Sequence, residues 1–407
     1  MEPTSKPAGP PTLAAPASRI GFRCASTSAA SFQAVVVALA VYGLGRGRAV
    51  AENHVDYKYE FYAEVADRMR VQTHSMLFEQ KLAPGVALKG AYVYDGISGA
   101  TPTGGPAPAG SSQVPTKVIN PDIRRAGYLE PNFKFGRHTF APQVAYSREN
   151  DYESVGLSFN YRVDFNQRNT TLNLGVAHNF DRVGGFYLGN RRRKKDATDF
   201  LLGLTQVLTP TTLLNVTLTL GTADGYLSDP YKGFRFTGYP DPNALFPDNR
   251  PGHRTKQIVS TTLTQFVEPL NGSAELTYRF YHDSQALIGH TVTLEWFQSF
   301  GQRLTIAPLV RYYRQSQACF YRLSFDADPS DTENPPLVPI PQFYSADYRL
   351  STLQTLTYGV SLSLKVWRQC FLDAAYKRYE MRGLDGVTPQ SSYAAANIYT
   401  VGLRLHF

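Results

Sequence analysis

The sequence has few of the residues and segments on which several protein classes depend. Its 407 residues include only 3 Cys, 4 Met and 2 Trp. The one long apolar run, residues 34–45, is shorter than the roughly 20 residues that a helix needs to cross a bilayer. Mean hydropathy is −0.28. These shortages exclude a helical membrane protein and a disulfide-rich scaffold.

Motifs for catalysis, metals and haem are also missing. No C-x-x-C-H, H-E-x-x-H or G-x-S-x-G pattern occurs. The formal net charge is +8, but part of it lies before residue 50, at Lys6, Arg19, Arg23, Arg46 and Arg48. The remaining charges form no basic stripe. We therefore expect neither an enzyme nor a nucleic-acid partner.

The N-terminal segment predicts export. Arg19 and Arg23 precede the apolar run, and Ala49-Val50-Ala51 follows it as an A-x-A cleavage box. We expect a signal peptide over residues 1–51, with cleavage near Ala51/Glu52, and one domain over residues 52–407. Cys24 would leave with the signal.

From residue 56 onward the dominant pattern is alternation with period 2, which is typical of strands with two different faces. Within 154–165, for example, Val155, Leu157 and Phe159 alternate with Ser154 and Gly156. The same pattern occurs in 213–221 and 355–364. Most of this chain is therefore predicted to be β-structure.

Three features favour a membrane barrel over a soluble sandwich. The predicted strands run about 10 to 14 residues, whereas a soluble strand has about 5 to 6. Their polar faces carry charges deep within the strands, such as Glu275 and Lys377. Aromatic residues, such as Tyr161, Trp296 and Trp367, gather near strand ends as in an interfacial girdle.

The fold predicted is all-β, a transmembrane antiparallel β-barrel of about 16 strands, with 14 as the alternative. Long extracellular loops are predicted at 96–122, 182–195, 224–253, 316–349 and 383–394, with short periplasmic turns between them. Pro131, Pro142 and Pro308 interrupt three of the predicted strands. The strands are predicted at 56–65, 68–81, 85–95, 123–134, 138–148, 152–166, 170–181, 196–208, 211–223, 254–267, 272–283, 288–299, 302–315, 350–366, 370–382 and 395–407.

The last strand ends in the alternating pattern of a barrel insertion signal, formed by Tyr399, Val401, Leu403, Leu405 and Phe407. This pattern predicts a bacterial outer-membrane location. The expected partners are outer-membrane lipid, lipopolysaccharide and the barrel assembly machinery.

Two cysteines remain after export. The predicted topology places Cys319 and Cys370 at opposite rims of the barrel, so we expect no disulfide between them.

Three segments carry a resemblance to a known family: Asp95–Pro102, Ser147–Ser154 and Gly225–Lys232. Together they resemble a family of bacterial outer-membrane proteins catalogued as domain of unknown function 3570, over about residues 56–407. The resemblance implies a barrel fold and an outer-membrane location. Members of this family tend to be encoded near periplasmic thioredoxin-like proteins and an FMN transferase, which implies these as partners.

One motif resembles an acceptor site for covalent FMN. Asp95-Gly96-Ile97-Ser98-Gly99-Ala100-Thr101 is similar to the pattern in proteins that carry FMN on a threonine through phosphate. The resemblance implies attachment at Thr101, with Asp95, Ser98, Gly99 and Ala100 forming the motif. Small residues would make the hydroxyl accessible to the transferase before the barrel closes. The alternative interpretation is a glycine-rich turn that leaves a strand.

Charges of both signs fall on the predicted inner face. They can line an aqueous pore, for which a 16-stranded barrel has room, or brace the lumen shut with ion pairs. Both interpretations stay open. The predicted lumen-lining residues are Arg162, Glu275, Arg279, Glu295, Arg311, Asp373, Lys377 and Arg404.

Two charge runs are predicted in loops. Residues 191–195 form a basic run that could bind lipopolysaccharide phosphates or remain a solvated charge run. Asp326, Asp328, Asp331 and Glu333 form an acidic run without the spacing of a calcium loop.

Two functional classes follow. One is a redox-associated barrel with FMN on Thr101 that takes part in electron transfer at the cell envelope. The other is a porin-like channel for small solutes, in which the 96–122 loop covers or constricts the lumen.

Overall fold

The computed structural model describes residues 53–65, 68–105, 111, 113–331 and 339–407, apart from the side chains of 117–121. The predicted signal peptide at 1–51 falls outside these residues. Within the described part of the chain, no helix is both long enough and apolar enough to cross a lipid bilayer.

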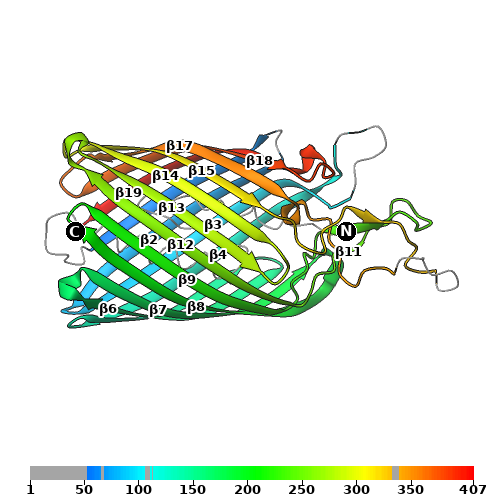
Figure 1. The fold of residues 1–407 in the computed structure, drawn as a ribbon, viewed down its shortest axis with the longest axis horizontal. Helices are drawn as coiled ribbons and strands as arrows, with labels where there is room; N and C mark the ends of the chain where they lie inside the picture. The colour runs from blue at the N-terminus through cyan, green and yellow to red at the C-terminus, as the bar shows by residue number, and fades with distance from the viewer. Residues whose placement is uncertain (1–52, 66–67, 106–110, 112, 332–338) are drawn as a thin grey trace.

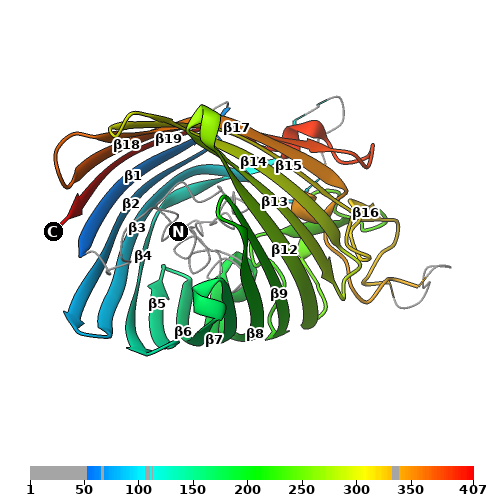
Figure 2. The same cartoon turned by 60° about the vertical axis from the view of Figure 1, so that its left-hand side comes forward.

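Sixteen strands form one closed antiparallel barrel, in which β1 pairs with β19 (Figures 1 and 2). The predicted number of strands is therefore confirmed. Three further short strands lie outside the barrel. The barrel strands are β1 (His54–Glu64), β2 (Met69–Ala83), β3 (Val86–Pro102), β4 (Thr116–Phe135), β5 (His138–Arg148), β6 (Tyr152–Phe165), β7 (Thr170–Gly185), β8 (Gly189–Thr209), β9 (Thr212–Gly225), β12 (His253–Val267), β13 (Gly272–Asp283), β14 (Ile288–Phe300), β15 (Leu304–Gln315), β17 (Leu353–Lys365), β18 (Cys370–Gly383) and β19 (Ala395–His406).

The two ends of the barrel differ. Short connections join the strands at one end, here called the turn end, where the chain also terminates (Figure 1). The longer connections lie at the other end, the loop end. Gly85 shows how tightly a turn can close: its φ is +78°, and a Cβ there would lie 2.6 Å from the Lys134 carbonyl oxygen. This alternation of short and long connections confirms the predicted topology.

The outward face of the barrel is apolar and the inward face is polar. Large apolar side chains are exposed on one face of each strand, such as Leu157 and Phe159 on β6 and Leu202 on β8. Four residues of the predicted insertion pattern, Tyr399, Val401, Leu405 and Phe407, are among the exposed side chains, and Leu403 is half-buried. This arrangement suits a lipid environment outside and water inside.

Four strands are longer at the loop end than predicted. β3 continues through Pro102, and β4 begins at Thr116, so the expected loop 96–122 shrinks to 103–115. β7 and β8 likewise absorb most of 182–195, including the basic run 191–195. The prediction that this run lies in a loop is wrong, because regular strand pairing continues beyond the apolar belt. There both faces are polar, so the sequence shows no alternation.

The three strand prolines are accommodated within paired strands. Pro131, Pro142 and Pro308 lie in β4, β5 and β15, opposite Leu88, Phe159 and Val360. Both described cysteines are free thiols, with Cys319 in the loop after β15 and Cys370 at the start of β18. The expectation of no disulfide between them is confirmed.

Candidate functional site

Two long connections at the loop end fold onto each other. We call residues 226–252 and 316–352 the loop cap; its residues 332–338 lie outside the described part. A small sheet joins its two segments: β10 (Gly233–Phe236) pairs with β11 (Phe246–Pro247) and, in parallel, with β16 (Ser324–Phe325). Figure 1 shows β11 beyond the ends of the barrel strands. Phe234 and Phe236 of β10 are almost fully buried; Phe234 packs against Tyr344 and Phe236 against Phe246.

A buried charge network holds the two segments of the loop cap together. The Asp347 carboxylate accepts hydrogen bonds from Arg349 Nε at 2.8 Å and from Arg250 Nη2 at 2.9 Å. Arg250 also pairs with Asp248 at 2.6 Å, and Arg349 pairs with Asp229. Burial raises the pKa of Asp347, but the Arg349 and Arg250 guanidinium groups outweigh it and hold that pKa well below its ordinary value.

Lys232 completes this network from the first segment of the loop cap. Its side chain is fully buried, and its Nζ lies 5.7 Å from the ring centre of Tyr348. Burial, with the nearby Arg349 charge, lowers the pKa of Lys232 to about 8.

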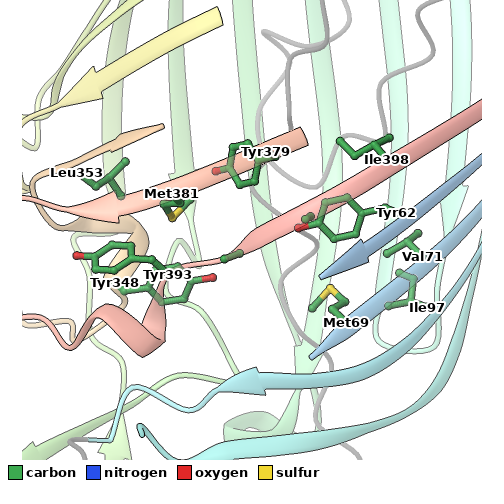
Figure 3. Close-up of a cluster of buried hydrophobic side chains, with 12 residues drawn as sticks. Tyr62, Met69, Val71, Ile97, Tyr348, Leu353, Tyr379, Met381, Tyr393 and Ile398 are labelled. Carbon is green, nitrogen blue, oxygen red and sulfur yellow. The ribbon is translucent and has the colours of Figure 1, made fainter. Parts of the chain in front are cut away.

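Tyr348 brings the loop cap into the mouth of the barrel. It lies in the short 3-10 helix η6 (Tyr348–Leu350). Its side chain packs in a buried cluster with residues from both sides of the junction where β19 pairs with β1 (Figure 3). Its ring lies edge-on to Tyr393, with 5.6 Å between the ring centres. Gln315 Nε2 donates to the carbonyl oxygens of Arg349 and Ser351, both at 2.9 Å, which fixes this segment to β15. The other cluster members are Tyr62, Met69, Val71, Ile97, Leu353, Tyr379, Met381, Ala394, Ala396 and Ile398.

The predicted FMN acceptor, Thr101, lies in β3 next to the loop cap. Lys232 Nζ lies 3.3 Å from its hydroxyl oxygen and also donates to the Pro102 carbonyl. Thr101 is only 6% exposed. In the folded chain this hydroxyl is therefore buried in a paired strand and does not lie in the predicted loop 96–122.

The other residues of the motif contribute to the structure of β3 and to its contacts with neighbouring strands. Asp95 is 2% exposed, pairs with Arg124 at 2.9 Å and accepts a hydrogen bond from Thr73 at 2.7 Å. The register shifts between Ile97 and Gly99, and Gly99 has φ +126°. Ser98, Gly99 and Ala100 thus form an irregular step within β3.

The eight predicted lumen-lining residues lie on barrel strands, at the positions that alternate with lipid-facing side chains. Arg404 Nη2 pairs with Asp373 at 3.0 Å between β19 and β18. Glu275 and Glu295 lie directly opposite each other on β13 and β14. Arg162, on β6, lies 3.9 Å from Asp164 on the same strand. The remaining three are Arg279, Arg311 and Lys377.

Two ion pairs on the described barrel strands run along the wall and do not cross the lumen. Arg124 pairs with Asp95 on the neighbouring strand. Lys256 on β12 pairs with Asp199 on β8 at 2.8 Å by passing over Gly221 of β9. Pairs of this kind strengthen the wall without bracing the lumen shut.

One side of the lumen, formed by β5 to β9, is lined mainly by neutral polar residues, with a few charges such as Arg162 and Asp199 among them; we call it the polar wall. Ser158 donates to Gln143 at 3.1 Å, and Asn215 donates to Thr205 at 2.7 Å. Gly156, Gly175 and Gly203 keep this side free of bulky groups. The other inward polar residues on it are Ser147, Ser154, Asn160, Asn173, Asn179, Thr217 and Thr219.

Sequence reasoning missed one acidic cluster at the loop end. Carboxylate oxygens of Asp122, Glu149 and Asp151 lie within 4.8 Å of one another, and Asn150 donates to Asp122 at 2.8 Å. None of the three lacks a partner within the protein. Asp122 and Glu149 are buried, and Asp151 is half-buried.

The sequence matches the family described as "Protein of unknown function (DUF3570)" over residues 25–190 and 186–393. The chain belongs to this family. The predicted resemblance is thereby confirmed, and the fold is that of an outer-membrane β-barrel of unknown function. A search of curated proteins finds no match.

Solved structures with a similar fold include outer-membrane barrels of several kinds. The siderophore receptor PirA from Pseudomonas aeruginosa has a TM-score of 0.41 and 7% identity, with 88% of this chain and 62% of that chain covered. CdiB from Acinetobacter baumannii has a TM-score of 0.49 and 8% identity, with 88% of this chain and 60% of that chain covered. OmpT from Vibrio cholerae has a TM-score of 0.42 and 8% identity, with 88% of this chain and 98% of that chain covered. The chain thus spans about 60% of the length of the first two.

Proposed function

We propose that this family member is an outer-membrane channel for small polar solutes, restricted at its extracellular mouth by the loop cap. The observation that carries the proposal is the inner surface of the barrel. Sixteen strands enclose enough space for a lumen, and the polar wall offers hydroxyl and amide groups to a hydrated solute.

The location follows from the two faces and the two ends of the barrel. The apolar outward face suits lipid, and short turns lie on the periplasmic side of such barrels. The turn end is then periplasmic and the loop end extracellular. The export predicted for residues 1–51 agrees with this placement.

The ion pairs support an open lumen over a braced one. Lys256–Asp199 and Arg404–Asp373 lie along the wall, so each of these four charges is neutralised by a partner in the wall itself. A lumen of mixed sign gives little selection by charge. We therefore expect the channel to select solutes mainly by size and polarity.

The loop cap restricts this channel at its extracellular mouth. Tyr348 and its neighbours pack against the walls formed by β1 to β3 and β18. Solute entry at this side then requires the segment around η6 to move, or passage beside it along the polar wall. Deleting the segment should widen the path.

Conductance in planar bilayers tests the proposal. The chain offers a clean deletion, because the Ala318 amide donates to the Leu350 carbonyl at 2.9 Å and residues 319–349 can be replaced by a short Gly-Ser linker. The wild-type protein and the deletion variant should both form channels, and the single-channel conductance of the deletion variant should be the larger. Absence of conductance from both, with folding verified by a heat-dependent gel shift, would refute a channel.

Covalent FMN at Thr101 is the second candidate, and it rests on the motif from Asp95 to Thr101. An FMN ester does not fit at a 6% exposed hydroxyl packed against Lys232 without displacing the loop cap. Attachment would have to precede folding. Intact mass of the chain, co-expressed with a periplasmic FMN transferase, decides this: a Thr101-dependent flavin adduct supports it, and an unmodified chain beside a modified control substrate contradicts it.

A further inference from the structure

A row of basic side chains crosses the outward face of β4 to β8 near the loop end. Arg125 on β4 lies directly opposite Arg148 on β5, and Arg182 on β7 lies directly opposite Lys194 on β8. Arg192 points the same way, two residues from Lys194. We call these five residues the basic row. Apart from Arg192, its members sit at directly paired positions, with Glu153 of β6 between the two pairs.

The basic row lies where the apolar belt ends. On β5, exposed Val144 and Tyr146 precede Arg148, and on β7 exposed Val176 and Phe180 precede Arg182. β5 has 11 residues, and the ten steps from His138 to Arg148, tilted by about 40° with a rise of about 3.3 Å each, climb about 25 Å from the turn end. An outer-membrane apolar band is about 25 Å tall. Arg148 therefore stands at the level of lipid headgroups, beyond the hydrocarbon.

Like charges that face each other across neighbouring strands destabilise a sheet. The basic row contains two such pairs, Arg125–Arg148 and Arg182–Lys194. Within the described residues, the side chains of Arg148 and Lys194 have no ion pair. A bound anion between the members of each pair would turn this repulsion into attraction.

The acidic groups on this face only partly neutralise the basic row. Glu153 lies 3.8 Å from Arg182 and 3.6 Å from Arg192, and it also accepts a hydrogen bond from Tyr146 at 2.9 Å. It lies directly opposite Arg148, but its ion pairs are with Arg182 and Arg192. Asp196 shares the outward face of β8 with Lys194 and stands opposite Asp224 of β9, where the basic row ends.

We propose that the basic row binds the phosphate groups of an anionic glycolipid in the outer leaflet. Guanidinium groups bind phosphate oxygens in a bidentate manner, and they sit here beside aromatic side chains at the lipid boundary. Tyr94 supports Arg125 at 5.9 Å from its ring centre. The acyl chains of such a lipid would lie along the apolar side chains below, on the outside of the polar wall.

The opposite wall provides a contrast. Its outward cations are scattered: Arg314 on β15 and Arg382 on β18 are exposed, while Arg378 pairs with Glu380 at 3.2 Å. No directly opposed cation pair joins β13, β14 and β15 on the described outward face. The proposed lipid site therefore belongs to one side of the barrel.

Native mass spectrometry of the full chain in detergent tests the proposal. The probes are bisphosphorylated lipid A, the same lipid after dephosphorylation, and inorganic phosphate. The protein should retain bisphosphorylated lipid A at least tenfold better than the dephosphorylated form, and it should not retain inorganic phosphate. Equal retention of both lipids would overturn the proposal, because the acyl chains alone would then explain binding.

Variants locate the site. The triple variant Arg125→Gln, Arg148→Gln, Lys194→Gln should lose about tenfold in retention of bisphosphorylated lipid A, whereas the control Arg314→Gln, Arg382→Gln should retain it. Equal loss in both would overturn the proposal. If the triple variant does not fold, Arg148→Lys replaces it, because this variant keeps the positive charge but loses the bidentate hydrogen bonds of the guanidinium group. Reduced retention of bisphosphorylated lipid A then supports the proposal, and wild-type retention contradicts it.

Discussion

Arg250 and Asp347 join the two segments of the loop cap across 97 residues of sequence, with 2.9 Å between Nη2 and Oδ2. Asp347 is 1% exposed and also holds Arg349. A single carboxylate thus anchors two guanidinium groups from different segments. Because the same segment carries Tyr348 into the mouth of the barrel, the stability of this network and the width of the mouth are coupled.

Asp347→Asn should therefore loosen the loop cap without unfolding the barrel. Removing one partner of a buried ion pair costs about 3–5 kcal/mol, since it leaves the opposite charge buried and poorly compensated. We expect faster proteolysis within the loop cap and larger or more frequent conductance steps. Asp241→Asn, at an exposed carboxylate of the same cap, is the control and should behave as wild type. Equal effects of both variants would contradict the anchoring role.

Acid should loosen the loop cap in the same way. The pKa of Asp347 in the folded cap lies below its ordinary value of 3.8, so its contribution to stability is present above pH 3.8 and is lost as the pH falls further. Buried Asp248 acts in the opposite sense, because burial raises its pKa and its protonation favours the folded cap. Proteolysis rates with an acid protease, measured from pH 4 down to 2, should rise for wild type, because this window lies where the Asp347 contribution is lost. They should rise less in Asp347→Asn, which has already lost the contribution.

Alkaline pH should tighten the loop cap through Lys232. Its pKa is about 8 in the folded cap against an ordinary 10.5, so between these values the unfolded cap binds more protons. Stability therefore rises with pH across that window and is constant below it. Proteolysis should slow from pH 8 to 10. In Lys232→Met this pH dependence should vanish, and a variant that retains it would show that another group is responsible.

The Lys256–Asp199 pair depends on the absence of a side chain at Gly221. An added Cβ would lie 2.1 Å from Asp199 Oδ1 and 2.3 Å from Lys256 Cε. Gly221→Ala should thus displace the ion pair and cost about 1–3 kcal/mol through overpacking. Urea unfolding in detergent, followed by the heat-dependent gel shift, measures this. Gly96→Ala on β3 is the matched control, because nothing lies within 4 Å of its added Cβ, and it should be neutral or slightly stabilising.

Sequence predicted the barrel well where lipid imposes alternation. The bounds of β5 and β13 were predicted to the residue, since period-2 hydropathy runs unbroken between turn residues. Outside the lipid both strand faces are wet, and the pattern ends before the strand does. The basic run 191–195 was therefore assigned to a loop although it extends β8.

The loop cap could not be predicted from sequence for a different reason. Arg349 and Asp229 pair across 120 residues, and Lys232 reaches Thr101 across 131. No local pattern encodes such contacts. For Thr101, the sequence therefore predicted a position in loop 96–122, whereas the residue lies in β3 and contacts a lysine of another connection.

Two adjacent residues of β6 offer a test of the wall itself. Phe159 faces lipid and is 42% exposed, whereas Ser158 faces the lumen on the polar wall and donates to Gln143. An arginine on the lipid face near mid-membrane costs about 2–4 kcal/mol, so Phe159→Arg should lower the yield of folded barrel and its unfolding midpoint in urea. Ser158→Arg adds the same charge to a wet surface, so the barrel should fold normally and its reversal potential under a salt gradient should shift toward anion preference. If both variants fold equally well, Phe159 does not face lipid. If Ser158→Arg leaves the reversal potential unchanged, ions do not pass along the polar wall; if the selectivity change follows Ser158→Arg alone, they do.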